Sequence, residues 1–265
     1  MRSSHFVLTL GRSGSNTLVD MLNQNPALLN FGEVLGSWTR LRKVQRRLRL
    51  LKINDADYLD WILGSRSFLS AANAFRTLGK IKDRRWSEIK SLRKIESVGV
   101  KDFSVNLVGG ELSQFLLTRP RIKVIGLLRQ NVIDRMVSNE TLEATGLVKV
   151  RNYESPLNRQ KVYIPPESVL RKLERIDAEN IELAGMLDVL PQERVFRVYY
   201  DRLFASAARA EEIVREIYTF LGVGDCRPRV RMRKILELDP LLAVLNAEEV
   251  RGIIAESRFG QQLGR

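Results

Sequence analysis

A glycine- and serine-rich segment, Gly11–Thr17 (GRSGSNT), holds the residues best suited to chemistry. Gly11 and Gly14 allow the backbone to turn tightly and to approach a ligand closely. A helical pattern follows, so the unpaired first amides of that helix and its dipole would face an anion bound in the turn. Polar donors fill the segment, namely Arg12, Ser13, Ser15, Asn16 and Thr17. The segment predicts a cradle for phosphate or sulfate; the alternative is a serine-rich turn that only caps the helix.

The usual loop of nucleoside-triphosphate enzymes has the pattern G-x-x-x-x-G-K-[ST], in which Lys reaches the β- and γ-phosphates and a hydroxyl binds magnesium. This chain has no Lys before Thr17, and its cation comes early in the loop, at Arg12. A guanidinium is a planar fork of donors that suits phosphate or sulfate. The loop therefore differs from the usual one, and a P-loop kinase-type nucleotide enzyme is kept as an alternative.

Two further positions could contribute to chemistry beside such an anion. Glu33 is a lone carboxylate in an apolar setting after the first helix, so it could be a general base; an ordinary loop glutamate is the alternative. Arg129 directly follows the apolar run Lys123–Leu128, and ligands of open α/β sheets bind at the carboxyl ends of strands. The alternative for Arg129 is a surface ion pair with Glu140 or Glu143.

Short apolar runs alternate with helical patterns along the chain. The predicted strands are Phe6–Leu10, Val98–Lys101, Lys123–Leu128 and Val195–Tyr199. The predicted helices are Thr17–Asn25, Gly110–Leu117, a segment after Asn131, Glu167–Leu190 with a break near Gly185, and Ala207–Leu221 ended by Gly222. This alternation indicates an α/β fold in which helices flank a central, mainly parallel β-sheet.

At 265 residues the chain fits one large α/β domain, 1–265, with an insertion. The insertion, at about 37–97, is basic and helical. Within it, Thr39–Lys52 has seven basic residues, no acid and one apolar stripe. A solvated basic face is the simpler interpretation of that helix, and contact with a membrane surface or nucleic acid is the sharper one. A long polar segment at about 145–166 is typical of a lid or acceptor loop.

Charge and cysteine content limit the partners and the compartment. The net charge of +13 attracts anions and anionic surfaces. The basic stretches lack interleaved aromatic residues, which disfavours nucleic-acid binding, although a non-enzymatic nucleic-acid-binding protein is a further alternative. A single cysteine, Cys226, allows no internal disulfide, and we find no secretory signal or long apolar span. We therefore expect a cytoplasmic protein, of unknown oligomeric state.

Three separated motifs together resemble the PAPS-dependent sulfotransferase superfamily, where PAPS is 3′-phosphoadenosine 5′-phosphosulfate. The likeness is strongest to bacterial carbohydrate sulfotransferases, including those that act on trehalose. Arg12–Ser15 resembles the 5′-phosphosulfate loop of the family, and Leu128–Asn131 with Ser138 resembles its 3′-phosphate motif. Val198–Leu203, followed by Phe220–Val223, is similar to the Tyr-Glu-Asp-Leu and Phe-Leu-Gly pair of the family.

The resemblance implies a P-loop-like three-layer fold and a role for each matching residue. The 5′-phosphosulfate would be held by Arg12, Ser13, Gly14, Ser15, Asn16 and Thr17. Arg129 and Ser138 would hold the 3′-phosphate, which distinguishes this donor from ATP. Lys234, in the basic run 227–234, would close over the donor. Glu33 matches the position where carbohydrate-type members place a glutamate base.

The chain departs from the family pattern at two places. Arg129 and Ser138 are nine positions apart, where many members have eight, so Arg135 could share the 3′-phosphate. Small-molecule members often use a catalytic histidine, and this chain has only His5, which we place before the first strand and interpret as structural. That assigns the base role to Glu33.

The implied reaction moves a sulfuryl group from PAPS to an acceptor hydroxyl and leaves 3′,5′-adenosine bisphosphate (PAP). Glu33 would take the hydroxyl proton, and Arg12 would stabilise negative charge on the bridging oxygen. No metal is expected, because arginine and backbone donors neutralise the donor charge and the sequence has no His/Cys ligand cluster. The expected acceptor is a carbohydrate or another small molecule with a hydroxyl group.

Overall fold

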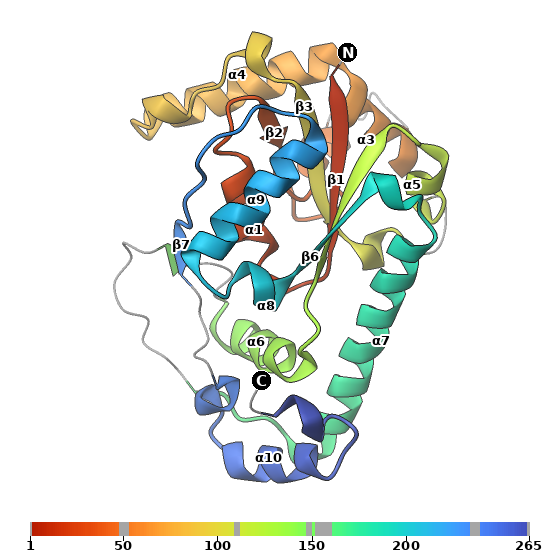
Figure 1. Cartoon of the computed structure of the whole chain (residues 1–265), viewed down its shortest axis with the longest axis vertical. Coiled ribbons are helices and arrows are strands. Elements are labelled where there is room, and N and C mark those ends of the chain that lie inside the picture. Colours follow the sequence, from red (N-terminus) through yellow and green to blue (C-terminus); the bar gives the residue numbers. More distant parts are fainter. Residues whose placement is uncertain are drawn as a thin grey trace.

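The computed structural model describes residues 2–47, 53–108, 112–146, 150–151, 161–233 and 239–263, and its centre is a five-stranded sheet (Figure 1). In spatial order the strands are β2 (Leu28–Asn30), β3 (Ser97–Phe103), β1 (Ser3–Thr9), β4 (Ile122–Leu128) and β6 (Val195–Tyr199). All neighbouring pairs are parallel. The predicted α/β fold with a parallel sheet is confirmed.

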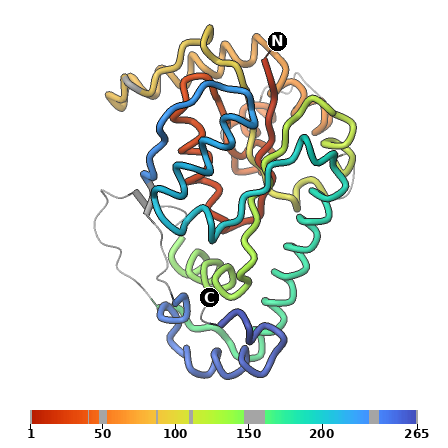
Figure 2. Tube along the Cα trace, in the orientation of Figure 1, coloured from red at the N-terminus to blue at the C-terminus, as the bar shows by residue number. Residues whose placement is uncertain are grey.

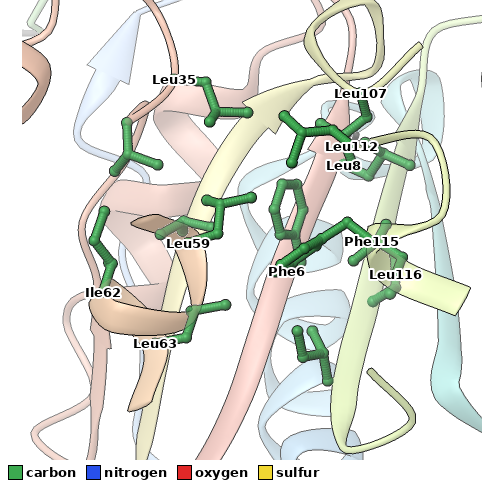
Figure 3. Packing of buried hydrophobic residues seen from close by; sticks show 14 of the residues in the cluster. Phe6, Leu8, Leu35, Leu59, Ile62, Leu63, Leu107, Leu112, Phe115 and Leu116 are labelled. Atoms are coloured by element: carbon green, nitrogen blue, oxygen red, sulfur yellow. The ribbon is translucent and has the colours of Figure 1, made fainter. Parts of the chain in front are cut away.

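Successive residues of β1 point to opposite faces of the sheet, and each face is covered by helices. Phe6 and Leu8 lie in a cluster with α3 (Asp55–Gly64), α5 (Phe115–Thr118) and α7 (Val169–Asp188), as Figure 3 shows for α3 and α5. Val7 points the other way, against α1 (Ser15–Leu22) and α9 (Ala207–Leu221). The sheet is therefore the middle of three layers, as the sequence resemblance implied.

The remaining elements lie around this core (Figure 2). Between β2 and β3 the chain forms α2 (Arg40–Arg47), α3 and α4 (Arg66–Lys82), followed by two short 3₁₀ turns, Trp86–Glu88 and Leu92–Lys94. Later elements are α6 (Val132–Thr145), β5 (Val150–Arg151), α8 (Tyr200–Leu203), β7 (Met232–Arg233) and α10 (Ala247–Ala255), with β5 antiparallel to β7. In the described ranges, no helix is both long and apolar enough to cross a bilayer.

Several elements differ from the sequence predictions. The predicted helix 39–52 is observed as Arg40–Arg47, and 48–52 lie outside the described residues. The helix predicted at 110–117 begins only at Phe115 and ends at Thr118. Gly185 does not break α7, because burial of Leu183 and Leu187 on either side offsets the low helix propensity of glycine. The three-residue strand β2 was not predicted, since it is too short for a periodic pattern.

His5 lies inside β1 and not before it, so its predicted position is corrected. The side chain is fully buried: Nδ1 lies 2.9 Å from the Ser97 hydroxyl, and Nε2 lies 3.1 Å from the Asn30 amide nitrogen. The ring lies against Gly99, where a Cβ would come within 2.2 Å of Nε2. Burial, and secondarily the charge of Lys90, lower the His5 pKa to about 3. These contacts fit the structural role that we expected for this residue.

We expect His5 to make stability depend on pH. The folded protein keeps this imidazole neutral down to its lowered pKa of about 3, whereas the unfolded chain takes up a proton below about 6.5. Stability therefore falls as the pH falls through this interval, and the loss between pH 7 and pH 5 amounts to about 2 kcal/mol. Urea unfolding of wild type and His5→Gln at both pH values measures it. Equal pH dependence in the two proteins would contradict the assignment, because His5 is the only histidine.

Candidate active site

The loop between β1 and α1 turns through two residues with left-handed backbone conformations. Arg12 has φ 61° and Gly14, the N-cap of α1, has φ 76°. The Gly14 carbonyl accepts the amide of Thr17 at 3.0 Å. A Cβ on Gly14 would lie 2.4 Å from the ring of Phe204, so both the dihedral angle and the space require glycine. This close fit brings α8 against the start of α1.

Two guanidinium groups hold the carbonyl oxygens of this loop. Arg129 donates from Nη1 to the Arg12 carbonyl, and Arg135 donates from Nε to the Gly11 carbonyl at 3.0 Å. Arg135 also pairs with Glu179 of α7. These contacts tie Arg135 to the loop backbone and to α7, and its share in binding the 3′-phosphate stays a prediction.

The hydroxyl of Ser13 is engaged inside the loop. It donates to the Leu10 carbonyl at 2.7 Å and lies 2.5 Å from the Thr9 hydroxyl. Ser13 is fully buried, so its side chain supports the turn.

Three of the predicted residues meet beside the loop. Arg12 Nε donates to the Ser138 hydroxyl of α6 at 2.8 Å. Arg129 is buried, pairs with Asp134 at 2.7 Å and lies with its guanidinium carbon 4.0 Å from the ring centre of Tyr200. The sequence alternative of a surface ion pair with Glu140 or Glu143 is therefore wrong.

The guanidinium groups of Arg12 and Arg129 lie close together in this cluster. Burial lowers the pKa of Arg12, and the neighbouring charge of Arg129 lowers it further, while Tyr200 acts in the opposite direction. Arg129 Nε is buried and has no hydrogen-bond partner among the residues that the structure describes. Two crowded guanidinium groups with an unused donor favour the binding of an anion.

Glu33 lies at the same edge of the sheet, after β2. Its carboxylate pairs with Lys101 at the end of β3 and accepts the indole N–H of Trp38 at 3.0 Å. Lys101 is only 1% exposed, and its Nζ also lies 3.4 Å from Asn16 Oδ1 in the loop. Lys101 thus joins the candidate base to the candidate anion loop.

Lys101 was not among the residues that we selected from the sequence. The available signal was a lysine that ends an apolar strand, since the strand ends of a parallel sheet share one edge. What the sequence lacked was the strand order, which places β3 between β2 and β1.

A second unpredicted residue, Asp102, fixes the backbone just after Glu33. Its Oδ2 accepts the amides of Val34 at 3.0 Å and Leu35 at 2.8 Å, and its Oδ1 accepts the side-chain amide of Asn106 at 2.6 Å. Asp102 is fully buried. It is therefore a positioning residue that holds the Glu33 segment against the end of β3.

The other predicted site residues lie in α1 or outside the described residues. Ser15 and Thr17 are buried in the first turn of α1, and Asn16 lies between them. Lys234 lies outside the described residues. Beside Arg129, a cavity of about 450 Å³ is lined by residues such as Gln130, Asn131 and Asn180. In the described part of the chain, no group of three or more His, Cys, Asp or Glu is placed to hold a metal ion.

No family model matches the sequence, and no curated protein matches it either. Among solved structures, the sulfotransferase from Alicyclobacillus acidocaldarius is 14% identical over 99% of this chain and 93% of that chain, with a TM-score of 0.47. The sulfotransferase domain of the Synechococcus PCC 7002 olefin synthase is 15% identical over 98% and 80%, with a TM-score of 0.43. A sulfotransferase from Mycobacterium avium is 14% identical over 100% and 73%, with a TM-score of 0.43. Likeness of this degree carries no functional conclusion by itself.

We expect Asp102→Asn to lower the free energy of unfolding by about 2 kcal/mol, because an amide leaves backbone donors facing a weaker acceptor or another donor. Urea unfolding measures the loss. The control is Asp188→Asn, at an exposed carboxylate paired with Arg197, which we expect to cost less than about 1 kcal/mol. Equal effects of the two substitutions would show that Asp102 does not hold the segment after Glu33.

Proposed function

We propose that this protein is a sulfotransferase that moves a sulfuryl group from PAPS to a hydroxyl of a carbohydrate or another small-molecule acceptor. One observation carries the proposal: a clamped anion loop, two neighbouring guanidinium groups and a carboxylate–lysine pair all lie at one edge of the sheet. An anionic donor and a proton acceptor are the two requirements of sulfuryl transfer to a hydroxyl.

The loop and the arginine cluster suit the two anionic ends of the donor. Backbone amides of Gly14, Ser15 and Asn16 at the start of α1 would hold the 5′-phosphosulfate, whereas the Thr17 amide already donates to the Gly14 carbonyl. Arg129 and Ser138 would hold the 3′-phosphate, and the buried, unpartnered Nε of Arg129 supports this assignment. Arg12 would exchange its bond with Ser138 for one with the donor. The cavity beside Arg129 has a lining of mixed polar and apolar side chains and a volume typical of small-molecule sites, and it is proposed for the nucleoside.

In the transfer step, the acceptor oxygen forms a new S–O bond while the bond between sulfur and the bridging oxygen of the 5′-phosphate breaks. Glu33 takes the hydroxyl proton. Lys101, held between Glu33 and Asn16, would lie beside the transferred group and balance its charge together with Arg12. The bridging oxygen leaves with PAP. Alignment and fixed positive charge thus supply most of the catalysis.

Calorimetric titration tests the donor assignment without knowledge of the acceptor. We expect PAP to bind without magnesium and more tightly than AMP, which lacks the 3′-phosphate. Ser138→Ala should weaken PAP about tenfold through the loss of a hydrogen bond to a charged group, and leave AMP unchanged. The control is Arg175→Gln, at an exposed side chain on α7. Preference for ATP with magnesium would favour a kinase-type enzyme, and equal binding of PAP and AMP would refute the 3′-phosphate assignment.

The base assignment is tested by Glu33→Gln with PAPS and a panel of hydroxyl acceptors that includes trehalose and p-nitrophenol. We expect kcat to fall by at least about 100-fold, because the amide cannot take the proton, while PAP affinity changes little. Glu182→Gln, at an exposed glutamate of α7, is the matched control. Full activity of Glu33→Gln would assign the base to another group.

A further inference from the structure

The outer face of α4 is apolar, although it is exposed. Phe75 is 68% exposed, Leu78 66% and Ile81 38%, and Trp86 in the following turn is 61% exposed. Ala71 and Ala74 are exposed beside them. We call these six residues the α4 stripe. It is unusual for a surface helix, whose outer face is normally polar.

The helix has a separate inner face, so the stripe is not simply the packing face of α4. Phe68, Leu69 and Asn73 are buried, and Asn73 donates to the Lys90 carbonyl at 3.1 Å. The five stripe residues that belong to α4 are spaced at three- and four-residue steps around the opposite side of the helix, and Trp86 follows in the next turn. In Figure 1, α4 lies along one end of the molecule, and its C-terminal end extends outward past the strands.

The segment that carries the stripe is positively charged. Residues 66–94 contain nine Lys and Arg against two acids, Asp83 and Glu88. Both acids are paired with basic residues of the same segment. Exposed cations of the same segment include Lys82, Arg84 and Lys94. The segment thus contributes more than half of the net charge of +13.

We propose that the α4 stripe docks on the surface of a lipid bilayer that contains anionic headgroups. A helix with aromatic and aliphatic residues on one side, flanked by Lys and Arg, lies in the interface with its apolar side among the acyl chains. Trp86, next to Arg84 and Arg85, has the amphipathic ring favoured at the headgroup level. A second copy of this chain is a poorer partner, because its stripe would bring the same excess of positive charge.

This proposal moves the membrane contact from the helix that the sequence suggested. In α2, the described part of 39–52, Val44 is the exposed large apolar residue, while Leu41 is partly buried against the core. The α4 stripe offers a wider apolar surface with comparable charge. The proposal does not depend on sulfuryl transfer, and its test measures no catalytic activity.

Vesicle sedimentation tests the proposal with the full-length protein. We expect binding to phosphatidylcholine vesicles that contain phosphatidylglycerol, weak binding to pure phosphatidylcholine, and weaker binding at high salt. Phe75→Ser combined with Leu78→Ser should reduce binding at least fivefold. The matched control combines Val189→Ser and Leu245→Ser, at side chains that are each 64% exposed outside α4, and should bind as wild type does.

Two further measurements separate lipid insertion from other causes. Lys82→Gln combined with Lys94→Gln should reduce binding to the anionic vesicles with no change in thermal stability. Anionic vesicles should shift the tryptophan emission to the blue, and Trp86→Phe should remove most of that shift. Absence of binding, equal binding by stripe and control variants, or a dimer in sedimentation velocity that only the stripe variant dissociates would overturn the proposal; the last outcome would identify a second copy as the partner.

Discussion

The turn between β1 and α1 depends on two buried guanidinium groups that hold its carbonyl oxygens, Arg135 on Gly11 and Arg129 on Arg12. Each arginine is anchored by a carboxylate, from α7 in one case and from α6 in the other. In a trans peptide the N–H points opposite to the C=O, so these two hydrogen bonds orient the amides of Arg12 and Ser13 away from the two arginines. The turn is thereby organised by its neighbours before any anion binds, which is the arrangement that electrostatic catalysis requires.

The two halves of the site differ in their charge balance. In the first half, Arg129 pairs with Asp134, and the guanidinium of Arg12 lies close enough to Arg129 for their positive charges to repel. Glu33 and Lys101 form a matched pair in the other half. An anionic donor would relieve the repulsion in the first half, whereas the second half can hold a neutral hydroxyl. In the proposed reaction, the first half would bind the anionic donor and the second half would take up the proton of the acceptor.

Local sequence patterns predicted the helices and strands that bury one apolar face at regular spacing. They did not predict the residues whose roles depend on the order of the strands in the sheet. The strand β6 and the helix α9 have the bounds that their apolar spacing predicted. The loop residues and Arg129 could be selected because glycine and arginine have specific uses beside an anion, whereas Ser138 was selected through the family resemblance. Lys101 and Asp102 could not, because their roles require β3 to lie between β2 and β1, and strand order is absent from local spacing.

The central position of β1 has a consequence for synthesis of the chain. Both of its neighbours come much later in the sequence: β3 begins at Ser97 and β4 ends at Leu128. Ribosomes add about 5–20 residues per second, so the apolar β1 waits on the order of ten seconds before its last partner exists. Until β3 has been made, Phe6, Val7 and Leu8 have no neighbouring strand to pair with. The earliest-made strand of this fold is thus a natural substrate for chaperones at the ribosomal exit, and its burial is complete only after α9, which ends at Leu221, has been translated.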